Sequence, residues 1–240
     1  MRLKKLFLVG LVCAFLAPSS AFGDTPQFNF KKDNVYFAMN AGATILNDLD
    51  FDIAGQTVHG ATGTGTGSAS FDAGASIGGA LGYVISDFVR AELELSYQEM
   101  DYDKFDLSGG NITSGGTTVT YAAGEYDVSG DINAFTVLAN VIFTPLGNKT
   151  FGGLSLTPLI GGGIGLVDWK SKIDSVGTQT INGTEDDTDF LASVMAGLEY
   201  THSQQFTFSI KYRHVWADSG KNGVEDAEAD NIAGTLTYRF

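Results

Sequence analysis

The sequence predicts an all-β fold in which eight antiparallel strands close into a small transmembrane β-barrel. Apolar and polar residues alternate over long segments, as in residues 88–98, and this pattern recurs about eight times along the chain. A period of two gives a strand one apolar and one polar face, and about 9–11 residues suffice for a tilted strand to cross a membrane. The connections also alternate between short and long, which is typical of such barrels.

The first four predicted strands cover residues 35–46, 70–85, 88–100 and 131–144. Each of them has an apolar residue at nearly every second position. Ser86 and Asp87 form a very short turn between the second and third strands. Pro145 ends the fourth strand, because proline has no N–H group to donate to a sheet, and residues 146–153 form the next turn.

The last four predicted strands cover residues 154–168, 188–201, 206–216 and 229–240. The fifth strand is rich in glycine, with Gly161, Gly162 and Gly163 in succession. No helix is predicted after this run, so the glycines indicate close strand packing rather than a nucleotide-binding loop. Residues 202–205 make a short turn between the sixth and seventh strands.

The connections of the predicted barrel differ in length on its two sides. The long connections cover residues 47–69, 101–130, 169–187 and 217–228. They predict four long extracellular loops on one side and short periplasmic turns on the other. An even number of strands then puts both chain ends on the periplasmic side. Residues 117–128 have the pattern of an additional hairpin, so the number of strands above the membrane stays open.

Residues 1–23 have the layout of a cleaved secretory signal peptide. A basic start precedes a mostly apolar run over residues 6–17, which is too short to cross a bilayer as a helix. Residues 24–240 are predicted to form a single barrel domain. The one cysteine, Cys13, lies within the signal, so the mature domain would contain no disulfide.

The chain is acidic, with 28 Asp and Glu residues against 14 Lys and Arg residues and a net charge of −14 at pH 7. Removal of the predicted signal leaves 11 basic residues and a net charge of −17. Such a charge argues against nucleic-acid binding, which requires a basic surface.

Alternation alone does not decide which face of the barrel points outward. In a soluble lipocalin-like barrel, the apolar face lines an interior cavity. Here charged residues occur in mid-strand on the polar face, and aromatic residues gather near both predicted membrane edges. Both observations favour a polar lumen and an apolar outer face in contact with lipid.

A polar lumen would hold seven charged residues. They are Arg90, Glu92, Glu94, Glu199, Lys211, Arg213 and Arg239. The third and seventh strands of an eight-stranded barrel lie opposite each other, and side chains can fill so narrow an interior. Because buried charges need partners, we expect the two glutamates of the third strand to pair with Lys211 and Arg213 and to close the lumen. The alternative is a wet lumen with loosely solvated charges.

Aromatic residues are expected at the two membrane interfaces. Tyr83, Phe143 and Tyr200 mark the periplasmic interface, and Trp169 and Trp216 mark the outer one.

Several segments resemble the outer-membrane-protein-A-type and opacity-type barrels, a family of small outer-membrane surface proteins. They are the charged inward positions, the glycine-rich segment 158–165, Gly-Leu-Glu-Tyr at 197–200 and the C-terminal Leu-Thr-Tyr-Arg-Phe. The resemblance implies a location in the cell outer membrane, in contact with lipid and lipopolysaccharide. It also implies that the barrel-assembly machinery recognises Tyr238 and Phe240 in the last strand. Family members anchor, adhere, evade host defences or stiffen the membrane.

The sequence contains no pattern that predicts catalysis, a cofactor or a metal site. One lipid-A deacylase family uses a His-x-Ser motif near a strand end, but here Trp216 stands where the serine would follow His214. The other histidines lie in a loop and a turn without partners at suitable spacing. The acidic clusters at 185–189 and 225–230 lack the spacing of an EF-hand loop. We therefore expect no enzyme activity, no cofactor and no metal.

Two functional classes remain. The first is a structural or adhesive surface protein whose loops bind a host or extracellular ligand, and the second is a narrow porin for small solutes. A charge-filled lumen favours the first class, and an unpaired inward face would favour the second. A soluble periplasmic lipocalin-like carrier and a lipid-modifying barrel enzyme are weaker alternatives.

Overall fold

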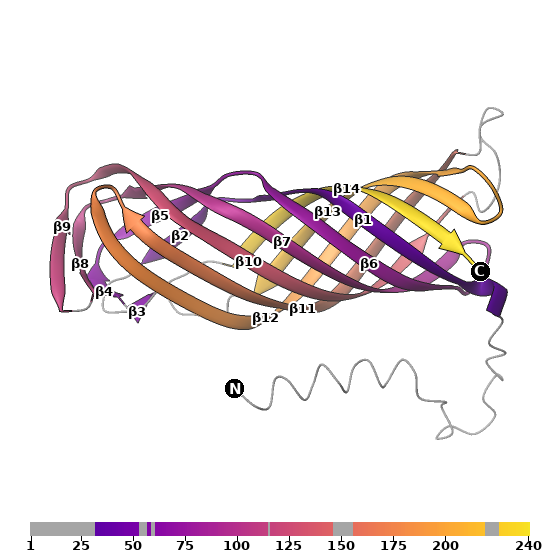
Figure 1. The fold of residues 1–240 in the computed structure, drawn as a ribbon, viewed down its shortest axis with the longest axis horizontal. Helices are drawn as coiled ribbons and strands as arrows, with labels where there is room; N and C mark the ends of the chain where they lie inside the picture. The colour runs from indigo at the N-terminus through magenta and orange to yellow at the C-terminus, as the bar shows by residue number, and fades with distance from the viewer. Residues whose placement is uncertain (1–31, 53–56, 59–60, 115, 146–155, 219–225) are drawn as a thin grey trace, which may run out of the picture.

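The structure, a computed structural model, describes residues 32–52, 57–58, 61–114, 116–145, 156–218 and 226–240. Most of these residues belong to antiparallel strands that coil around a common axis (Figure 1). No helix in these ranges is long and apolar enough to cross a membrane.

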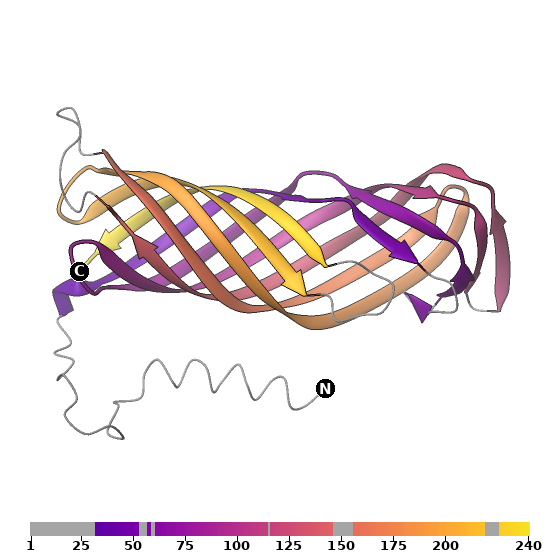
Figure 2. The ribbon, with the colours of Figure 1, turned by 180° about the vertical axis from the view of Figure 1, so that it is seen from behind.

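Eight strands form the barrel wall. They are β1 (Val35–Leu46), β6 (Gly74–Val84), β7 (Val89–Leu107), β10 (Gly124–Phe143), β11 (Leu156–Val176), β12 (Gln179–Thr201), β13 (Phe206–Asp218) and β14 (Ala227–Arg239). Each strand pairs with the next, and β1 closes the ring by pairing with β14 from Tyr36↔Arg239 to Leu46↔Ala229. The predicted eight-stranded antiparallel barrel is therefore confirmed. The start of β1 and the C-terminus lie at the same end of it (Figure 2).

Six further strands lie at the opposite end, which is the predicted extracellular end (Figure 1). The strands β2 (Leu49–Asp52) and β5 (Thr66–Phe71) extend the barrel wall, because β5 pairs with β2 and with the upper part of β7. The strands β3 (Thr57–Val58), β4 (Ala61–Thr64), β8 (Gly110–Ser114) and β9 (Thr117–Tyr121) form a separate four-stranded sheet. Residues 117–128 do not form a hairpin of their own, because β9 pairs with β8 and residues from Gly124 onward belong to β10.

Two of the segments predicted as long loops are mostly strand. β7 and β10 stay paired well beyond the predicted strand ends, as far as Leu107↔Gly124. β11 and β12 stay paired as far as Val176↔Gln179, and Gly177 makes the turn between them with a positive φ of 57°. The extracellular part is therefore built largely from extended hairpins.

A belt of large apolar side chains covers the outer surface of the barrel. It includes Ile77, Leu81, Val141, Ile160, Leu198, Ile210 and Ile232, each at least half exposed. Along β12 the belt runs from Phe190 to Tyr200, which matches the roughly 9–11 residues that a tilted strand needs to cross a membrane. A continuous apolar surface of this size is unfavourable in water, so the belt faces lipid.

At the upper edge of the lipid belt, the long strands reverse the chemistry of their two faces without a change of phase. The outward face of β7 is apolar as far as Tyr97 and acidic from Glu99 onward. Its inward face carries a charge at Glu94 and is apolar at Met100 and Tyr102. Lipid surrounds the lower part of the strand and water surrounds the upper part, so the apolar face points outward below and inward above. On β7 the prediction of a polar lumen is therefore correct only for the periplasmic half. On the wall formed by β10, β11 and β12, the buried apolar residues Ile142, Leu159 and Met195 also face inward at this level.

The inward apolar side chains of the extracellular half pack together. The larger cluster comprises Ala69, Met100, Tyr102, Leu107, Tyr121, Val128, Ile132, Ile173 and Val176. A second cluster of Ala134, Leu138, Val167 and Leu191 lies on β10, β11 and β12. The upper barrel is thus stabilised from within, as a soluble protein is.

Candidate functional site

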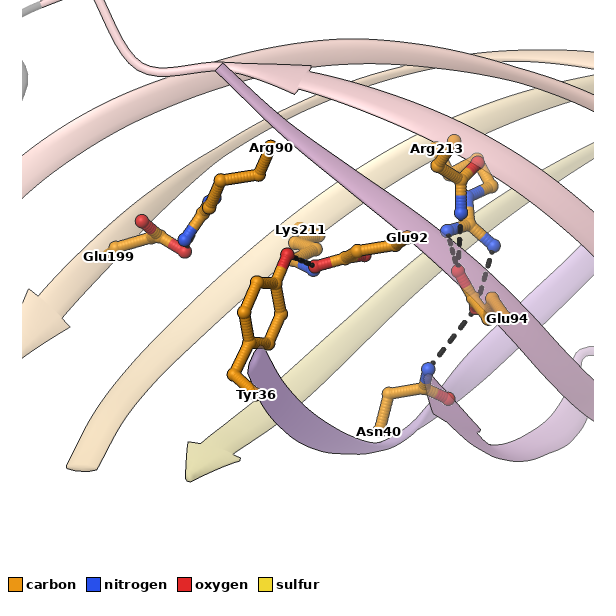
Figure 3. Close-up of polar contacts among 9 residues, drawn as sticks. Tyr36, Asn40, Arg90, Glu92, Glu94, Glu199, Lys211 and Arg213 are labelled. Atoms are coloured by element: carbon orange, nitrogen blue, oxygen red, sulfur yellow. Dashed lines mark hydrogen bonds and ion pairs between the residues drawn. The ribbon is translucent and has the colours of Figure 1, made fainter. Parts of the chain in front are cut away.

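Charged side chains from opposite walls meet in the periplasmic half of the lumen. Three successive inward positions of β7 carry Arg90, Glu92 and Glu94, because side chains on one face of a strand recur at every second residue. The facing wall contributes Glu199 from β12 and, from β13, Lys211 and Arg213. Figure 3 shows these side chains pointing toward one another across the lumen. We call the six residues the charged layer.

The charged layer contains three ion pairs. Arg90 Nη2 lies 2.8 Å from Glu199 Oε1. Lys211 Nζ lies 3.8 Å from Glu92 Oε2. Arg213 binds Glu94 through both ends of its guanidinium group, with Nη1 to Oε1 at 2.9 Å and Nη2 to Oε2 at 2.5 Å. Such a bidentate ion pair is stronger and more directional than a single hydrogen bond.

Neutral side chains donate further hydrogen bonds to the two glutamates of β7. Asn40 and Asn140 each donate to one oxygen of Glu94, at 3.1 and 3.0 Å. Each oxygen of that carboxylate therefore accepts two hydrogen bonds. The Tyr36 hydroxyl donates to Glu92 at 2.7 Å.

The Tyr36 ring occupies space that a neighbouring glycine leaves open. A Cβ atom at Gly82 would overlap this ring, so a larger residue would displace the donor to Glu92. The Arg90 guanidinium lies 5.7 Å from the centre of the same ring, within the range of a cation–π contact. The ring therefore ties two members of the charged layer to β1.

The charged layer is tightly enclosed. Glu92, Glu94 and Glu199 are each no more than 6 % exposed, and Lys211 is 9 % exposed. The open space among the side chains of the upper two pairs amounts to about 10 Å³. This is room for about one water molecule.

The predicted lumen residues are brought together with one exception. The two glutamates of β7 meet Lys211 and Arg213, and Arg90 meets Glu199. Arg239 lies opposite Tyr36 in the β1–β14 pairing, and its side chain forms no ion pair within the described part of the chain. Sequence reasoning missed the neutral partners. The sequence does contain a signal for them, because Tyr36 and Asn40 on the first predicted strand and Asn140 on the fourth share the phase of the inward face.

One of the five aromatic residues predicted at the membrane interfaces does not lie on the outer face of the barrel. Phe143, Tyr200 and Trp216 are about 40 % exposed on the outer face, and Tyr83 has the same outward phase. Trp169 points inward instead, so its prediction as an interfacial residue is wrong.

Trp169 packs beside the Ala134, Leu138, Val167 and Leu191 cluster, and its indole N–H donates to Asp189. The reason is that β11 continues above the lipid belt, where the apolar face of a strand turns inward. The aromatic residues of the last strand lie on its outward face, where the Tyr238 ring contacts those of Phe206 and Phe240 at 5.2 and 5.4 Å.

The outer wall carries a small polar cluster near the extracellular edge of the belt. Asp230 accepts a hydrogen bond from the Tyr212 hydroxyl at 2.6 Å and lies 2.7 Å from His214 Nδ1. The His214 ring also stacks edge-on against Trp216. Within the ranges that the structure describes, no group of three or more His, Cys, Asp or Glu residues is arranged to hold a metal ion.

Comparisons with known proteins agree with this architecture. The family described as outer membrane protein beta-barrel domain matches residues 10–240. No curated protein matches the chain.

Among solved structures, the chain is similar to Neisserial surface protein A, with 14 % identity and a TM-score of 0.48 over 86 % of this chain and 97 % of that one. It is also similar to OprG from Pseudomonas aeruginosa, with 12 % identity and a TM-score of 0.43 over 87 % and 97 % of the two chains. For Ail from Yersinia pestis, the identity is 11 % and the TM-score 0.41 over 85 % and 98 %.

Replacement of Arg213 by Met should lower the free energy of unfolding by about 3–5 kcal/mol, because Glu94 would stay buried without its cation. The double variant Glu94→Leu/Arg213→Met should recover most of this loss, since no uncompensated charge remains. Urea unfolding of the barrel in lipid vesicles measures both effects.

The matched control is Lys104→Met, which breaks the exposed pair with Glu125 (N–O distance 3.5 Å). Such an exposed pair contributes at most about 1 kcal/mol. If Arg213→Met destabilised the barrel no more than this control does, the charged layer would have no structural role.

Proposed function

The chain belongs to the outer-membrane β-barrel protein family, and on that premise we propose that it is a non-conducting surface protein whose extracellular hairpins bind other molecules. The observation that carries this proposal is the charged layer, with its three buried ion pairs and little free space. The protein resides in the cell outer membrane.

The charged layer argues against passage of solutes. A solute would have to separate pairs such as Arg213 and Glu94, and a buried charge that loses its partner costs about 3–5 kcal/mol. The cavity beside Glu92, Glu94, Lys211 and Arg213 has a volume of about 10 Å³, which is too small for an organic solute. A narrow porin would need a continuous wet path, and the pairing of the inward charges favours a closed lumen.

The extracellular hairpins supply a firm platform for binding. The part of β12 above the belt, from Gln179 to Asp189, extends roughly 33 Å along the strand, at about 3.3 Å per residue. Because these segments are paired strands, a partner would bind without a large cost for ordering flexible loops.

The charge of this platform indicates the kind of partner. Outward residues such as Glu99, Asp101, Asp103 and Asp186 are acidic. Electrostatic complementarity favours a basic partner, and binding should weaken as the salt concentration rises.

Several further roles belong to the proposal. Residues 1–23, which lie outside the described residues, would act as the cleaved export signal. The apolar belt would contact lipid and lipopolysaccharide, and Tyr238 and Phe240 would form the signal for the barrel-assembly machinery. An enzymatic role is not proposed, because the described residues offer His214 a tyrosine, a tryptophan and carboxylates but no serine nucleophile.

In planar bilayers the wild-type protein should give no stable single-channel steps. The triple variant Arg90→Ala/Glu92→Ala/Glu94→Ala removes the β7 half of the charged layer, and it should give small steps because water can fill the space. The double variant Leu93→Ala/Leu95→Ala, on the lipid face of the same strand, should stay silent. Stable steps in the wild-type protein would support the narrow porin instead.

Shortening the β11–β12 hairpin should abolish binding without unfolding the barrel. Deletion of residues 171–185 leaves Lys170 and Asp186, which face each other in register and can be joined by an Asn-Gly turn. Cells that display this variant should adhere to cultured epithelial cells no better than cells without the protein. Leu95→Ala serves as the control with an intact hairpin. Migration on a detergent gel before and after boiling verifies that both variants are folded. Full adhesion by the shortened barrel would contradict the proposed binding surface.

A further inference from the structure

Above the charged layer the lumen widens into a cavity of about 270 Å³. Its floor includes Glu94 and Arg213, and its walls come mainly from the upper parts of β7, β10, β11 and β12. We call this cavity the apolar chamber. It is much larger than the space within the charged layer, so the lumen is closed below and hollow above.

Apolar side chains line most of the apolar chamber. They include Met100, Ile132, Ala134, Leu138, Trp169 and Leu191. Most of these residues are buried members of the two apolar clusters, so the walls are firmly packed. Ligand sites typically combine such apolar walls with a few polar groups.

The polar groups of the apolar chamber are suited to an uncharged ligand. The carboxylate of Glu94 and the guanidinium of Arg213 neutralise each other through two contacts. Ser96 and Thr136 face the cavity just above this pair and offer hydroxyl groups. The Tyr102 and Ser171 hydroxyls, which also line the cavity, bond to each other at 2.7 Å.

The walls disfavour an anionic ligand. Glu185 and Asp189 line the cavity, and Asp189 accepts a hydrogen bond from the Trp169 indole. A carboxylate or sulfonate placed among these acids would lose its hydration and meet like charge.

We propose that the apolar chamber binds an uncharged, largely apolar small molecule such as a hydrocarbon chain or a pair of aromatic rings. The volume supports this size, since a dry protein cavity of about 150 Å³ accommodates one benzene ring. The molecule could be free in the medium or be the acyl chain of a membrane lipid, which share the same chemistry. This binding role goes beyond the proposed surface role, because a chamber with a closed floor can hold a ligand whether or not the hairpins bind a partner.

The chain provides its own reporter for this ligand. It has two tryptophans, Trp169 in the chamber wall and Trp216 on the outer face. The Trp216→Phe variant therefore reports on the chamber alone. Bromine quenches indole fluorescence at short range, so 1-bromooctane and its anionic analogue 8-bromooctanoate form a matched pair of probes.

In the Trp216→Phe background, 1-bromooctane should quench Trp169 in a saturable manner, and 8-bromooctanoate should bind about tenfold more weakly or not at all. Ala134→Phe fills the chamber and should weaken binding by about tenfold or more. Ala139→Phe is the control, because it adds the same ring to the lipid face of the same strand. Ala217→Phe fills the chamber from β13 and replaces Ala134→Phe if that variant fails to fold.

A second arm identifies the source of the ligand. Vesicles made from lipids with brominated acyl chains would quench Trp169 without any added probe if a lipid chain fills the chamber. Quenching by 1-bromooctane alone would indicate a free molecule, and either result supports the chamber as a binding site. The proposal is overturned if quenching by 1-bromooctane never saturates, or if it is unchanged in both chamber-filling variants. Equal binding of the anionic probe would overturn it as well.

Discussion

The pairing of three successive β7 side chains with the opposite wall is the interaction on which the interior of this barrel depends. Six charged groups are withdrawn from water there, and each would be very unfavourable without its partner. The hydrogen bonds from Tyr36, Asn40 and Asn140 extend the layer to β1 and β10, so it ties together strands that share no backbone pairing with β13. The layer thereby separates a narrow periplasmic lumen from the hollow space above.

A second constraint acts along the length of each strand, because the medium outside the barrel changes from lipid to water. The strands do not change phase at this boundary, so the composition of both faces must change instead. On β7 the change falls between Tyr97 and Met100, and on β11 the outward face changes from Ile164 and Leu166 to Asp168 and Lys170. The inward face changes in the opposite sense, from the charged residues of the charged layer to the apolar residues around the apolar chamber.

The sequence predicts the membrane part of the fold well and the extracellular part poorly. Outward apolar residues at every second position define the eight membrane strands, and the phase of Lys211 and Arg213 suffices to predict that they meet the glutamates of β7. Above the belt the outward residues become polar, so residues 101–107 and 169–176 look like loops although they are strands. The sequence pattern does not show where a strand passes from lipid into water, and for this reason it predicts Trp169 at the membrane interface. Tyr36 and the two asparagines reach the glutamates because of the level at which each residue lies along the barrel axis. That level depends on the stagger between neighbouring strands, which the alternation of residues within a strand does not predict.

The most direct test of the closed layer is the sidedness of thiol labelling in oriented vesicles. The predicted mature chain has no cysteine, so Thr136→Cys, above the layer, and Arg239→Cys, near its periplasmic side, each provide a single site. A small charged methanethiosulfonate reagent should modify Thr136→Cys from the extracellular side only and Arg239→Cys from the periplasmic side only. Modification of either site from both sides would contradict the closed layer and show a continuous path through the barrel.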